Sequence, residues 1–587
     1  MLLRLPAELQ RMVVEELRLP RLPVGTPRSL NPDFIDARSA LVRLCLTSRR
    51  FFGLAEPLLY ESIALTHDKQ FVHLLHALLV KRDRRSWIRS MACPMSIMSE
   101  TDHLQALPIW NRLIAPCKET GLDPREKSAL LFCGLEVGRV LREDRWDDGE
   151  FLWDGPFQFF DELLAVILCL TTHLEDLLLQ IPTDQEPHLD DHLLHLANAL
   201  SLGRSIHPSG VLKSLRSVRA QPTRLVECKS HKSGYREIRP RNVVPGRYDP
   251  AFGIDPLCLR AFEMDTVEAV ECCGDNGIWF KLLKPDHGPW TDEELPLDLK
   301  GFRSLKSLKL YESRTTPSYL RHLLEQAHSL EVFHYTTRQQ EWRQDYSEPR
   351  YTEYAFMPRD FFSMNEALEP IKDTVKELTL GNVQRSWDNG DQEYRDLELI
   401  VVLGSFERLT HLSIDIRWLI PISLDMDEEV AIVPLCKRLP RSIEVIRLTE
   451  TWTRRDLRAL SSSSRLERQA MAWVQAALWT LLVVDDESGG KEMKLCHLRK
   501  VTLAAVPTFH SFGARGIESD DEDDDGDFDC APLKTDQGIE EMKSAFSIHG
   551  VEFNVEWICD HLFFSPSAGD SEDDDESYEY EYDLYSV

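Results

Sequence analysis

Hydrophobic residues in the first 65 positions recur at the spacing of short helices. Leu9, Met12, Val13 and Leu17 follow one another at steps of three, one and four residues, so they form one stripe of a helix. Pro6 is suited to the first turn of that helix, because a proline there gives up no helical hydrogen bond. Prolines at 20, 23 and 27 end the pattern. The sequence therefore predicts one short helix followed by a proline-rich loop.

Two further helices are expected before residue 66. Asn31-Pro32 predicts a helix start, with Asn31 as the cap and Pro32 as the first helical residue. The apolar stripe of this second helix consists of Ala37, Leu41, Leu44, Cys45, Ser48 and Phe52. Gly53 is expected to end it, and a third helix is expected at about 54–60. Three helices of this size bury little apolar area, so the unit should pack on the next domain, on a partner, or on both.

A second pattern recurs through the rest of the chain: two apolar residues three positions apart, then a third two positions later. It occurs at Ile88-Met91-Cys93, Leu174-Leu177-Leu179, Leu215-Val218-Ala220, Val267-Val270-Cys272, Leu305-Leu308-Leu310, Leu330-Phe333-Tyr335, Val375-Leu378-Leu380, Leu409-Leu412-Ile414, Ile443-Ile446-Leu448 and Leu498-Val501-Leu503. The residue after the first apolar position is charged in nine of these ten segments. The alternation in the second half of each segment is the period of a half-buried strand. Helix-like segments precede several of them, at 161–170 and 317–327 for example.

These segments predict a stack of parallel strands joined by helices or loops. A short strand and its helix cannot bury their apolar faces alone, so neighbouring units stack into one continuous core. The first apolar positions lie 25 to 86 residues apart, which leaves room for the crossovers that parallel strands need. We expect an α/β fold, irregular because most of its units are long.

Composition narrows the class of function. The chain has 587 residues, with 68 Lys and Arg against 98 Asp and Glu, a net charge of −30. Such a charge argues against a nucleic-acid or anionic-membrane partner. Two acidic tracts, 519–529 and 570–583, carry 8 and 9 acids and are expected to be disordered. Thirteen dispersed cysteines without a Cys-x-x-Cys spacing are typical of reduced thiols.

No signal peptide or membrane span is expected. Pro6 and Glu8 interrupt the apolar start of the chain. The longest apolar stretch, 471–484, is shorter than the roughly 20 residues of a span and is better explained as a buried helix. We expect an intracellular location, cytoplasmic or nuclear.

Candidate catalytic chemistry is sparse. The sequence contains no P-loop, dinucleotide-binding glycine motif or nucleophile elbow. His188, His192 and His195 could share a helix face, but interleaved leucines favour an ordinary amphipathic helix over a metal site. We therefore predict no catalytic residue, no metal and no cofactor. A basic segment at 228–250 is interpreted as a solvated connector or, alternatively, a contact for an acidic partner or for the protein's own acidic tracts.

The N-terminal motifs resemble the F-box, in the form found at the start of many fungal proteins. The resemblance rests on Leu5-Pro6-x-Glu8-Leu9, on the segment 41–52 (LVRLCLTSRRFF) and on Glu56-Pro57-Leu58-Leu59-Tyr60, in that order. The loop at 18–31 is longer and richer in proline than that pattern expects. The strand segments resemble the divergent leucine-rich-repeat region that follows many F-boxes, although the asparagine usual after each strand is absent.

These resemblances imply three domains. Residues 1–66 would be an F-box-like helical domain, 67–565 an irregular leucine-rich-repeat-like solenoid and 566–587 a disordered acidic tail. Polar insertions are expected near 228–250, 338–358 and 510–540.

The F-box resemblance implies a substrate-recognition subunit of a Skp–cullin–F-box ubiquitin ligase. Its partners would be a Skp-type adaptor, through it a cullin, and a protein substrate held on the solenoid. The adaptor-binding residues carried over by resemblance are Leu5, Pro6, Leu9, Leu41, Leu44, Cys45, Ser48, Leu58, Leu59 and Tyr60. Some of them should instead form the unit's own core. Three alternatives stay open: a repeat scaffold working outside any ligase, a helical cap with no docking role, and an enzyme, which would require a deep pocket with converging titratable groups.

Overall fold

A computed structural model gives the arrangement of the chain. It describes residues 4–19, 32–65, 68–93, 109, 113, 122–133, 135, 155–182, 199–200, 202, 211–223, 264–273, 303–313, 317–337, 363–381, 400, 402–419, 434–449, 474–482, 484–485, 491–492, 495–505 and 536–557. The segments 228–250, 338–358 and 566–587, both acidic tracts and the histidine cluster at 188–195 lie outside these residues.

One sheet of 12 strands runs through the molecule, and its strands follow one another in chain order. All neighbouring pairs in it are parallel. The strands are β1 (Ser62–Ala64), β2 (Ser90–Cys93), β3 (Asp176–Pro182), β4 (Ser217–Thr223), β5 (Ala269–Cys273), β6 (Ser307–Ser313), β7 (Val332–Thr337), β8 (Glu377–Gly381), β9 (His411–Asp415), β10 (Val445–Thr449), β13 (Lys500–Ala505) and β14 (Glu552–Trp557). A separate antiparallel pair joins β11 (Val484–Asp485) to β12 (Lys491–Glu492). The predicted α/β class with parallel strands is therefore confirmed.

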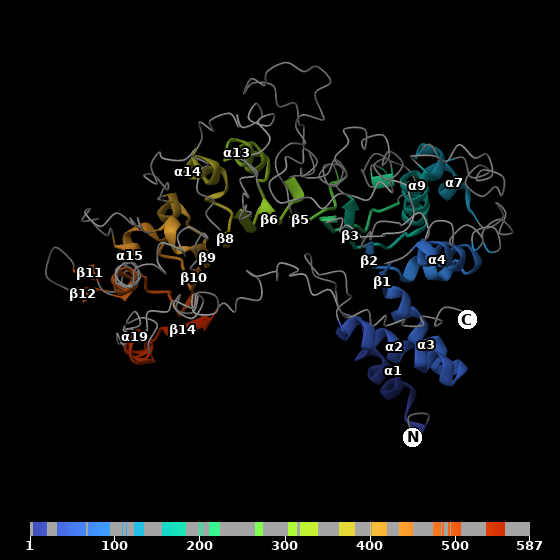
Figure 1. Cartoon of the computed structure of the whole chain (residues 1–587), viewed down its shortest axis with the longest axis horizontal. Coiled ribbons are helices and arrows are strands. Elements are labelled where there is room, and N and C mark those ends of the chain that lie inside the picture. The colour runs from blue at the N-terminus through green and yellow to red at the C-terminus, as the bar shows by residue number, and fades with distance from the viewer. Residues whose placement is uncertain are drawn as a thin grey trace, which may run out of the picture.

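The sheet curves into an arch, with helices along its outer side and α1 to α3 beneath the end that carries β1 (Figure 1). The α-helices are α1 (Ala7–Glu15), α2 (Pro32–Thr47), α3 (Arg49–Glu61), α4 (Asp68–Val80), α5 (Asp83–Trp87), α7 (Pro124–Phe132), α9 (Gly155–Leu170), α13 (Pro317–Gln326), α14 (Met364–Leu368), α15 (Leu435–Arg438) and α19 (Asp536–Ile548). Short 3-10 turns are η8 (Glu369–Ile371), η9 (Val402–Ser405) and η10 (Ile416–Trp418). The helices expected near 161–170 and 317–327 correspond to α9 and α13.

The ten apolar segments predicted from the sequence are all strands of this sheet. Every one of their apolar side chains that the structure describes is at most 4% exposed. Neighbouring strands align these positions with one another; Leu308, for example, pairs with Val270 on one side and Phe333 on the other. The result is one continuous hydrophobic core between the sheet and the helices and loops that cover its outer side.

Two edge strands were not among the ten predicted. The register places Tyr60, Ile63 and Leu65 in line with the three apolar positions of β2, so β1 has the same pattern and begins before residue 66. At the other end, Phe553 and Val555 of β14 align with β13, but Gly550 replaces the first apolar residue. Gly550 has a φ of 71°, a left-handed conformation that favours glycine. Because a glycine stands at this position, the three-residue apolar pattern does not identify β14.

A charged residue precedes ten of the twelve strands, and these residues form a ladder across the sheet, which we call the charge ladder. Its members are Glu61, Arg89, Glu175, Arg216, Glu268, Lys306, Glu331, Lys376, Glu444 and Arg499, with Thr410 interrupting it before β9. Their signs alternate, and neighbours pair across the strands: Glu268 lies 2.8 Å from Arg216 and 3.1 Å from Lys306. Arg89 likewise pairs with Glu175, and Lys376 with Glu331. Opposite charges on neighbouring strands favour this register over a slipped one.

Replacing Glu268 with lysine should therefore weaken the arch. The substitution removes two ion pairs and places three cations on consecutive strands, so we expect the free energy of unfolding to fall by about 1–2 kcal/mol. Urea unfolding at low and high salt measures the effect, which should shrink in high salt as the repulsion is screened. Glu407→Lys, an exposed reversal outside the charge ladder, is the matched control. A loss equal to that of the control would contradict the stabilising role of the charge ladder.

No helix in the described part of the chain is long and apolar enough to cross a membrane. The apolar stretch at 471–484 contains a helix at 474–482 in which Val474, Leu478 and Leu481 are buried. The predicted helix is confirmed and is buried on one side, while its Trp479 is 40% exposed. The Thr480 hydroxyl of this helix accepts a hydrogen bond of 2.8 Å from the Leu435 amide, which joins it to α15.

Candidate functional site

The helices α1, α2 and α3 form a small unit at one end of the arch. The break between α2 and α3 lies at Ser48, not at Gly53 as predicted. Ser48 has extended backbone angles, and its hydroxyl accepts a hydrogen bond from the Phe51 amide, so it caps α3. Gly53 lies inside α3, where a Cβ would meet no atom within 4 Å. A good N-cap thus divided an apolar stripe that continued unbroken in the sequence.

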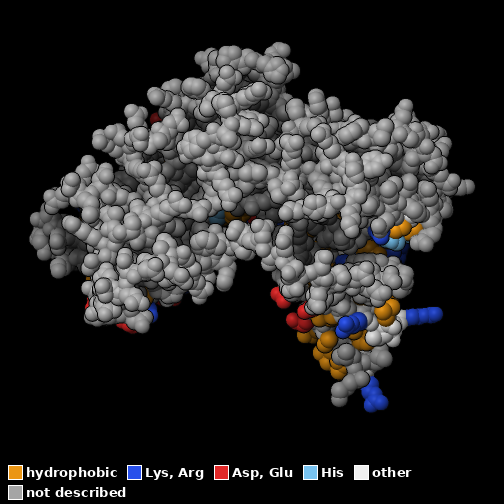
Figure 2. Space-filling view, viewed as in Figure 1, with side chains coloured by type: hydrophobic (Ala, Val, Ile, Leu, Met, Phe, Trp, Pro, Cys, Tyr) orange, Lys and Arg blue, Asp and Glu red, His pale blue; other side chains and the backbone are white. Residues whose placement is uncertain are grey.

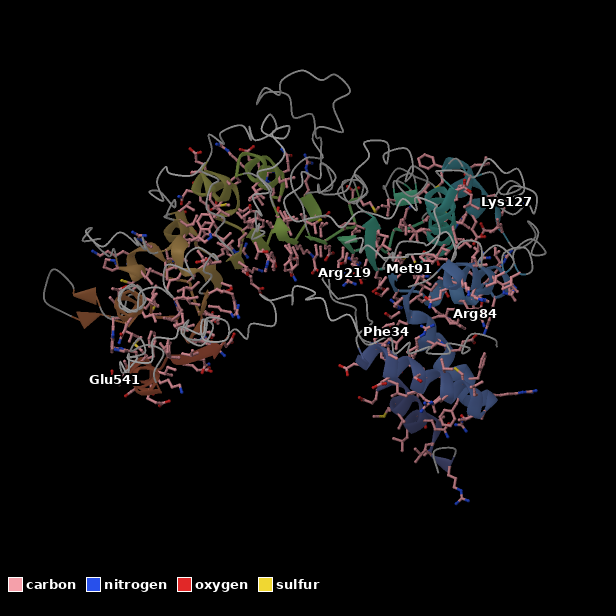
Figure 3. All side chains as sticks on the ribbon, in the orientation of Figure 1. Phe34, Arg84, Met91, Lys127, Arg219 and Glu541 are labelled. Carbon is pink, nitrogen blue, oxygen red and sulfur yellow. The ribbon has the colours of Figure 1, made fainter. Side chains whose placement is uncertain are left out.

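The inner side of the helical unit packs on the first strands of the sheet. Val14, Phe34, Leu41 and Phe51 form a cluster that also includes Ala64 of β1, Ala92 of β2 and Leu178 of β3. Figure 3 labels Phe34 between α2 and these strands. Two alanines on the neighbouring strands leave space for the helices to approach the sheet. The unit therefore shares part of its core with the arch.

The outer side of the helical unit exposes large hydrophobic residues. Their exposed fractions are Leu9 44%, Met12 59%, Val13 40%, Ile35 39%, Leu46 64% and Phe52 41%. We call these six residues the apolar surface. Figure 2 shows hydrophobic side chains gathered over these helices, with Lys or Arg side chains beside them. Among the described residues, only five other large hydrophobic side chains are as exposed, and they are spread over the rest of the molecule. Such a concentration is typical of a surface that a partner covers.

The predicted stripe of α1 contributes to this surface. Leu9, Met12 and Val13 point to solvent, whereas Gln10 and Val14 are the buried residues of the helix. The Gln10 side-chain amide donates a hydrogen bond of 3.0 Å to the Leu5 carbonyl. The predicted stripe therefore divides: its residues within α1 face away from the core, whereas Leu17, just beyond the helix, packs partly on it.

The ten predicted adaptor-binding residues separate into three groups. Pro6 and Leu9 are exposed and Leu5 is half-buried, so they are accessible. Leu41 is fully buried, and Leu44, Cys45, Leu58 and Leu59 are half-buried against the same inner core. Ser48 caps α3, and Tyr60 packs on the core of the arch.

Sequence reasoning left five members of the apolar surface off the predicted binding list. They are Met12, Val13, Ile35, Leu46 and Phe52. Met12 and Val13 share the helical stripe of Leu9, which was a usable signal. Leu46 and Phe52 belong to the motif segment 41–52, and only the packing of α2 and α3 reveals that they are exposed.

A cluster of charged and aromatic residues fixes α3 against α4 and α5; we call it the joint. The Glu56 side chain, 4% exposed, accepts hydrogen bonds from Lys81 at 2.5 Å and Arg84 at 2.7 Å. The Arg84 guanidinium lies 4.8 Å from the ring centre of Tyr60, which lies 6.3 Å from that of Trp87. Burial alone would raise the pKa of Glu56, but the bonds from Lys81 and Arg84 outweigh it and hold the pKa below 4.5.

Glu56→Gln should destabilise the joint at neutral pH but not in acid. Because the folded-state pKa is lowered, the Glu56 carboxylate stabilises the folded protein above pH 4.5, and this contribution disappears as the pH falls below that value. We expect the variant to lose about 1–3 kcal/mol of unfolding free energy at pH 7, and less at pH 3.5. Chemical unfolding of both proteins at the two pH values measures the difference, with Glu8→Gln as the exposed control. A gap that stays constant with pH would contradict the assigned role of the carboxylate.

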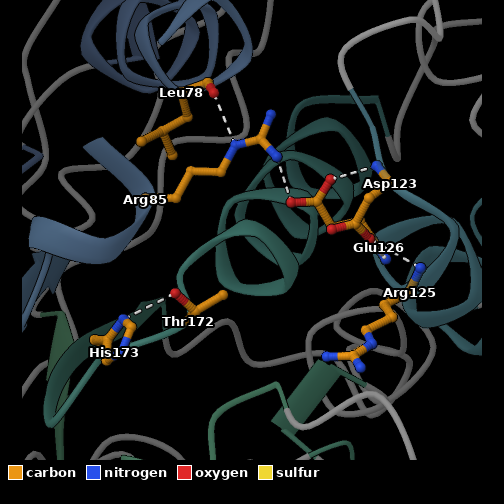
Figure 4. Close-up of polar contacts among 7 residues, drawn as sticks. All are labelled: Leu78, Arg85, Asp123, Arg125, Glu126, Thr172 and His173. Atoms are coloured by element: carbon orange, nitrogen blue, oxygen red, sulfur yellow. Dashed lines mark hydrogen bonds and ion pairs between the residues drawn. The ribbon is translucent and has the colours of Figure 1, made fainter. Parts of the chain in front are cut away.

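A second ion pair secures the outer helices near the joint. Arg85 of α5 pairs with Glu126 of α7 and donates a hydrogen bond of 2.8 Å to the Leu78 carbonyl of α4 (Figure 4). Glu126 also accepts a hydrogen bond from the Asp123 amide, while the Asp123 carboxylate caps α7. These contacts join α4, α5 and α7, so the helices against which α3 packs are held to one another.

The inner face of the sheet is polar beyond the helical unit. Asp176 of β3 pairs with Arg219 of β4 at 2.5 Å, and Arg219 is 1% exposed and labelled in Figure 3. On the next strands, Glu271 pairs with Lys309 at 3.1 Å. The ring centres of Tyr311 and His334 are 4.4 Å apart; burial and the Lys309 charge lower the pKa of His334 to about 4, so it is neutral at pH 7. In this row Arg219 is buried, whereas Lys309 is partly exposed and accessible to a polar protein segment.

Metal ligands and thiols were the remaining candidates for chemistry. Among the described residues, no group of three or more His, Cys, Asp or Glu is arranged to hold a metal ion. Cys133 and Cys169 have their sulfur atoms 3.7 Å apart, and the hydrogen bond between them together with burial raises the pKa of Cys169. The Cys169 thiol is therefore a protonated packing group rather than a nucleophile.

Comparison with known proteins adds no assignment: no family model matches the chain, and no curated protein matches it.

Proposed function

We propose that this chain is a substrate-recognition subunit of a Skp–cullin–F-box type ubiquitin ligase, with α1 to α3 as its F-box and the arch as a divergent leucine-rich-repeat-like solenoid. The observation that carries the proposal is the apolar surface, because it lies on the same three helices that contain the F-box-like motifs. Exposing six large hydrophobic side chains to water on one small unit is unfavourable unless a partner covers them, so such a group marks an interaction site.

The inner packing of the unit explains how such a surface is held ready. Leu41 and Phe51 pack in the core that the unit shares with the sheet, which fixes the positions of α2 and α3. Their burial leaves Leu9, Met12 and Leu46 outside, where a Skp-type adaptor could cover them. Covering an exposed leucine or methionine contributes about 1 kcal/mol or more, so several together support specific binding.

The mechanism would be positional rather than chemical. The adaptor would bring the cullin and its ubiquitin-conjugating enzyme to the helical unit, while the arch holds a protein substrate. Transfer would then be accelerated by the high effective concentration of substrate lysines near the enzyme. The joint and the shared core support this role, because they restrict the angle between the helical unit and the arch.

The test is direct binding of the purified full-length chain to a purified Skp-type adaptor, measured by calorimetry and gel filtration. We expect a stoichiometric complex. Absence of binding would reject the ligase assignment and leave the alternative of a repeat scaffold outside any ligase, for which the polar inner face of the arch would be the binding surface.

A further inference from the structure

The junction of α2 and α3 combines exposed arginines with exposed apolar residues; we call it the basic corner. It consists of Arg43, Arg49 and Arg50 together with Leu46 and Phe52 of the apolar surface. All three arginines are exposed, and within the described part of the chain none of them makes an ion pair. The same holds for other exposed arginines such as Arg82, so what distinguishes the basic corner is the presence of exposed Leu46 and Phe52 beside its cations.

Two of these arginines also occupy unfavourable positions. Arg49 and Arg50 lie in the first turn of α3, which contains no acidic residue. The N-terminal end of a helix carries a partial positive charge and favours Asp or Glu there. Residues that break a local rule without a compensating contact point to a function. The basic corner therefore fits a ligand that is both acidic and apolar.

The chain contains one segment of that chemistry in its C-terminal tail. Residues 570–583 hold nine acids, and tyrosines at 578, 580, 582 and 585 alternate with or follow them. The other acidic tract, 519–529, has a single aromatic residue, Phe528. It is also anchored at both sides near the far end of the sheet, by β13 and by α19. The tail thus matches the basic corner in both charge and apolar character.

The tail is long enough to reach the basic corner. Twelve strands place β14 at eleven steps of about 4.8 Å from β1, or about 53 Å along the arch. From Trp557, where β14 ends, the tract begins 13 residues on and ends 26 residues on. At 3.3–3.6 Å per extended residue, those lengths correspond to roughly 43 to 94 Å. The span to β1, against which the helical unit packs, falls within this range.

We propose that the acidic, tyrosine-containing tail at 570–583 binds the basic corner of its own chain and competes with the Skp-type adaptor for the apolar surface. The regulatory part of this inference rests on the proposed function, whereas the contact itself does not. Arginines would bind the acidic side chains, and the tyrosine rings would cover Leu46 and Phe52. The tail would lower adaptor affinity until the adaptor, or a change of charge in the tail, displaces it.

The contact can be measured without an adaptor. A fluorescent peptide of residues 566–587 is added to the full chain whose nine tail acids are replaced by Asn and Gln, so that no internal tail competes. We expect binding that weakens as salt rises and falls at least about tenfold in the Arg43→Glu, Arg49→Glu, Arg50→Glu variant. Glutamate at 49 and 50 suits the first turn of α3, so this variant should fold. The control reverses Arg82, Arg303 and Arg441, which are also exposed, and changes the net charge equally.

Adaptor binding then tests the competition. The chain with the neutralised tail should bind the adaptor about tenfold more tightly than the natural chain. In the natural chain the adaptor can bind only those molecules whose apolar surface is not covered by the tail, and this lowers its apparent affinity. Peptide binding that is equal in the corner variant and its control would overturn the inference, as would an unchanged adaptor affinity. Peptide binding at the corner without any adaptor binding would reject the ligase proposal alone and leave the tail contact standing.

Discussion

Replacing Leu9 and Met12 together with aspartate is expected to abolish binding of a Skp-type adaptor, with a loss of affinity of at least about 100-fold, or about 2.7 kcal/mol. Both side chains are exposed in the free protein, at 44% and 59%, so the carboxylates stay hydrated there. In a complex the same carboxylates would be buried without partners, which is strongly unfavourable. The measurement is calorimetric titration of the variant with the adaptor, together with a thermal unfolding curve.

The matched control for this variant is Leu131→Asp with Ile548→Asp. These residues are as exposed, at 65% and 80%, but lie on α7 and α19, away from the helical unit. We expect the control to bind the adaptor within about twofold of the natural chain and both variants to unfold at the same temperature. Equal losses in the two variants would mean that added charge, not the apolar surface, weakens binding, and the proposed docking surface would be wrong.

Leu41→Ala should give the opposite result, a large loss of stability. Leu41 is 0% exposed and packs in the core between the helices and β1 to β3. Removing its branched end leaves a cavity there, so we expect the helical unit to lose about 2–5 kcal/mol. Hydrogen exchange across residues 32–61 measures the local loss, since the arch beyond β3 can remain folded while these helices open.

Leu46→Ala is the control for this core substitution. Leu46 is in the same helix, α2, but is 64% exposed, and a surface truncation changes stability by no more than about 0.5 kcal/mol. We expect hydrogen exchange of the Leu46 variant to match that of the natural chain. If Leu41→Ala exchanged no faster than Leu46→Ala, the shared core between the helical unit and the sheet would be misassigned.

The Leu9/Met12 and Leu41 substitutions test different properties: the first tests partner binding and the second tests the stability of the helical unit. Residues such as Leu41 hold the helical unit on the arch, while residues such as Leu9 face away from it. Both kinds occur in the same motifs, so a motif match alone assigns them equal roles. Direct contact with the sheet divides them, because a leucine that packs on Ala64 or Ala92 cannot also be covered by a partner.

Sequence patterning was sufficient for the elements of the arch. Ten strands were identified from three apolar residues each, because a parallel strand in a stacked core must bury every second side chain and its pattern is local. Helices α9 and α13 and the helix at 474–482 were likewise visible. Where the local signal was displaced, as at Gly550 before β14, the strand was missed.

The sequence by itself determined ten of the strands and several of the helices, because each element's period of apolar residues follows from its own backbone geometry. Only the tertiary structure decided that α2 ends at Thr47, that the apolar stripe of α1 faces solvent, and that charges separated by 25 to 86 residues alternate along one ladder. Those features depend on which elements touch. A local pattern shows that a residue is apolar or charged, but its neighbours across the fold determine whether it is buried, paired or left for a partner.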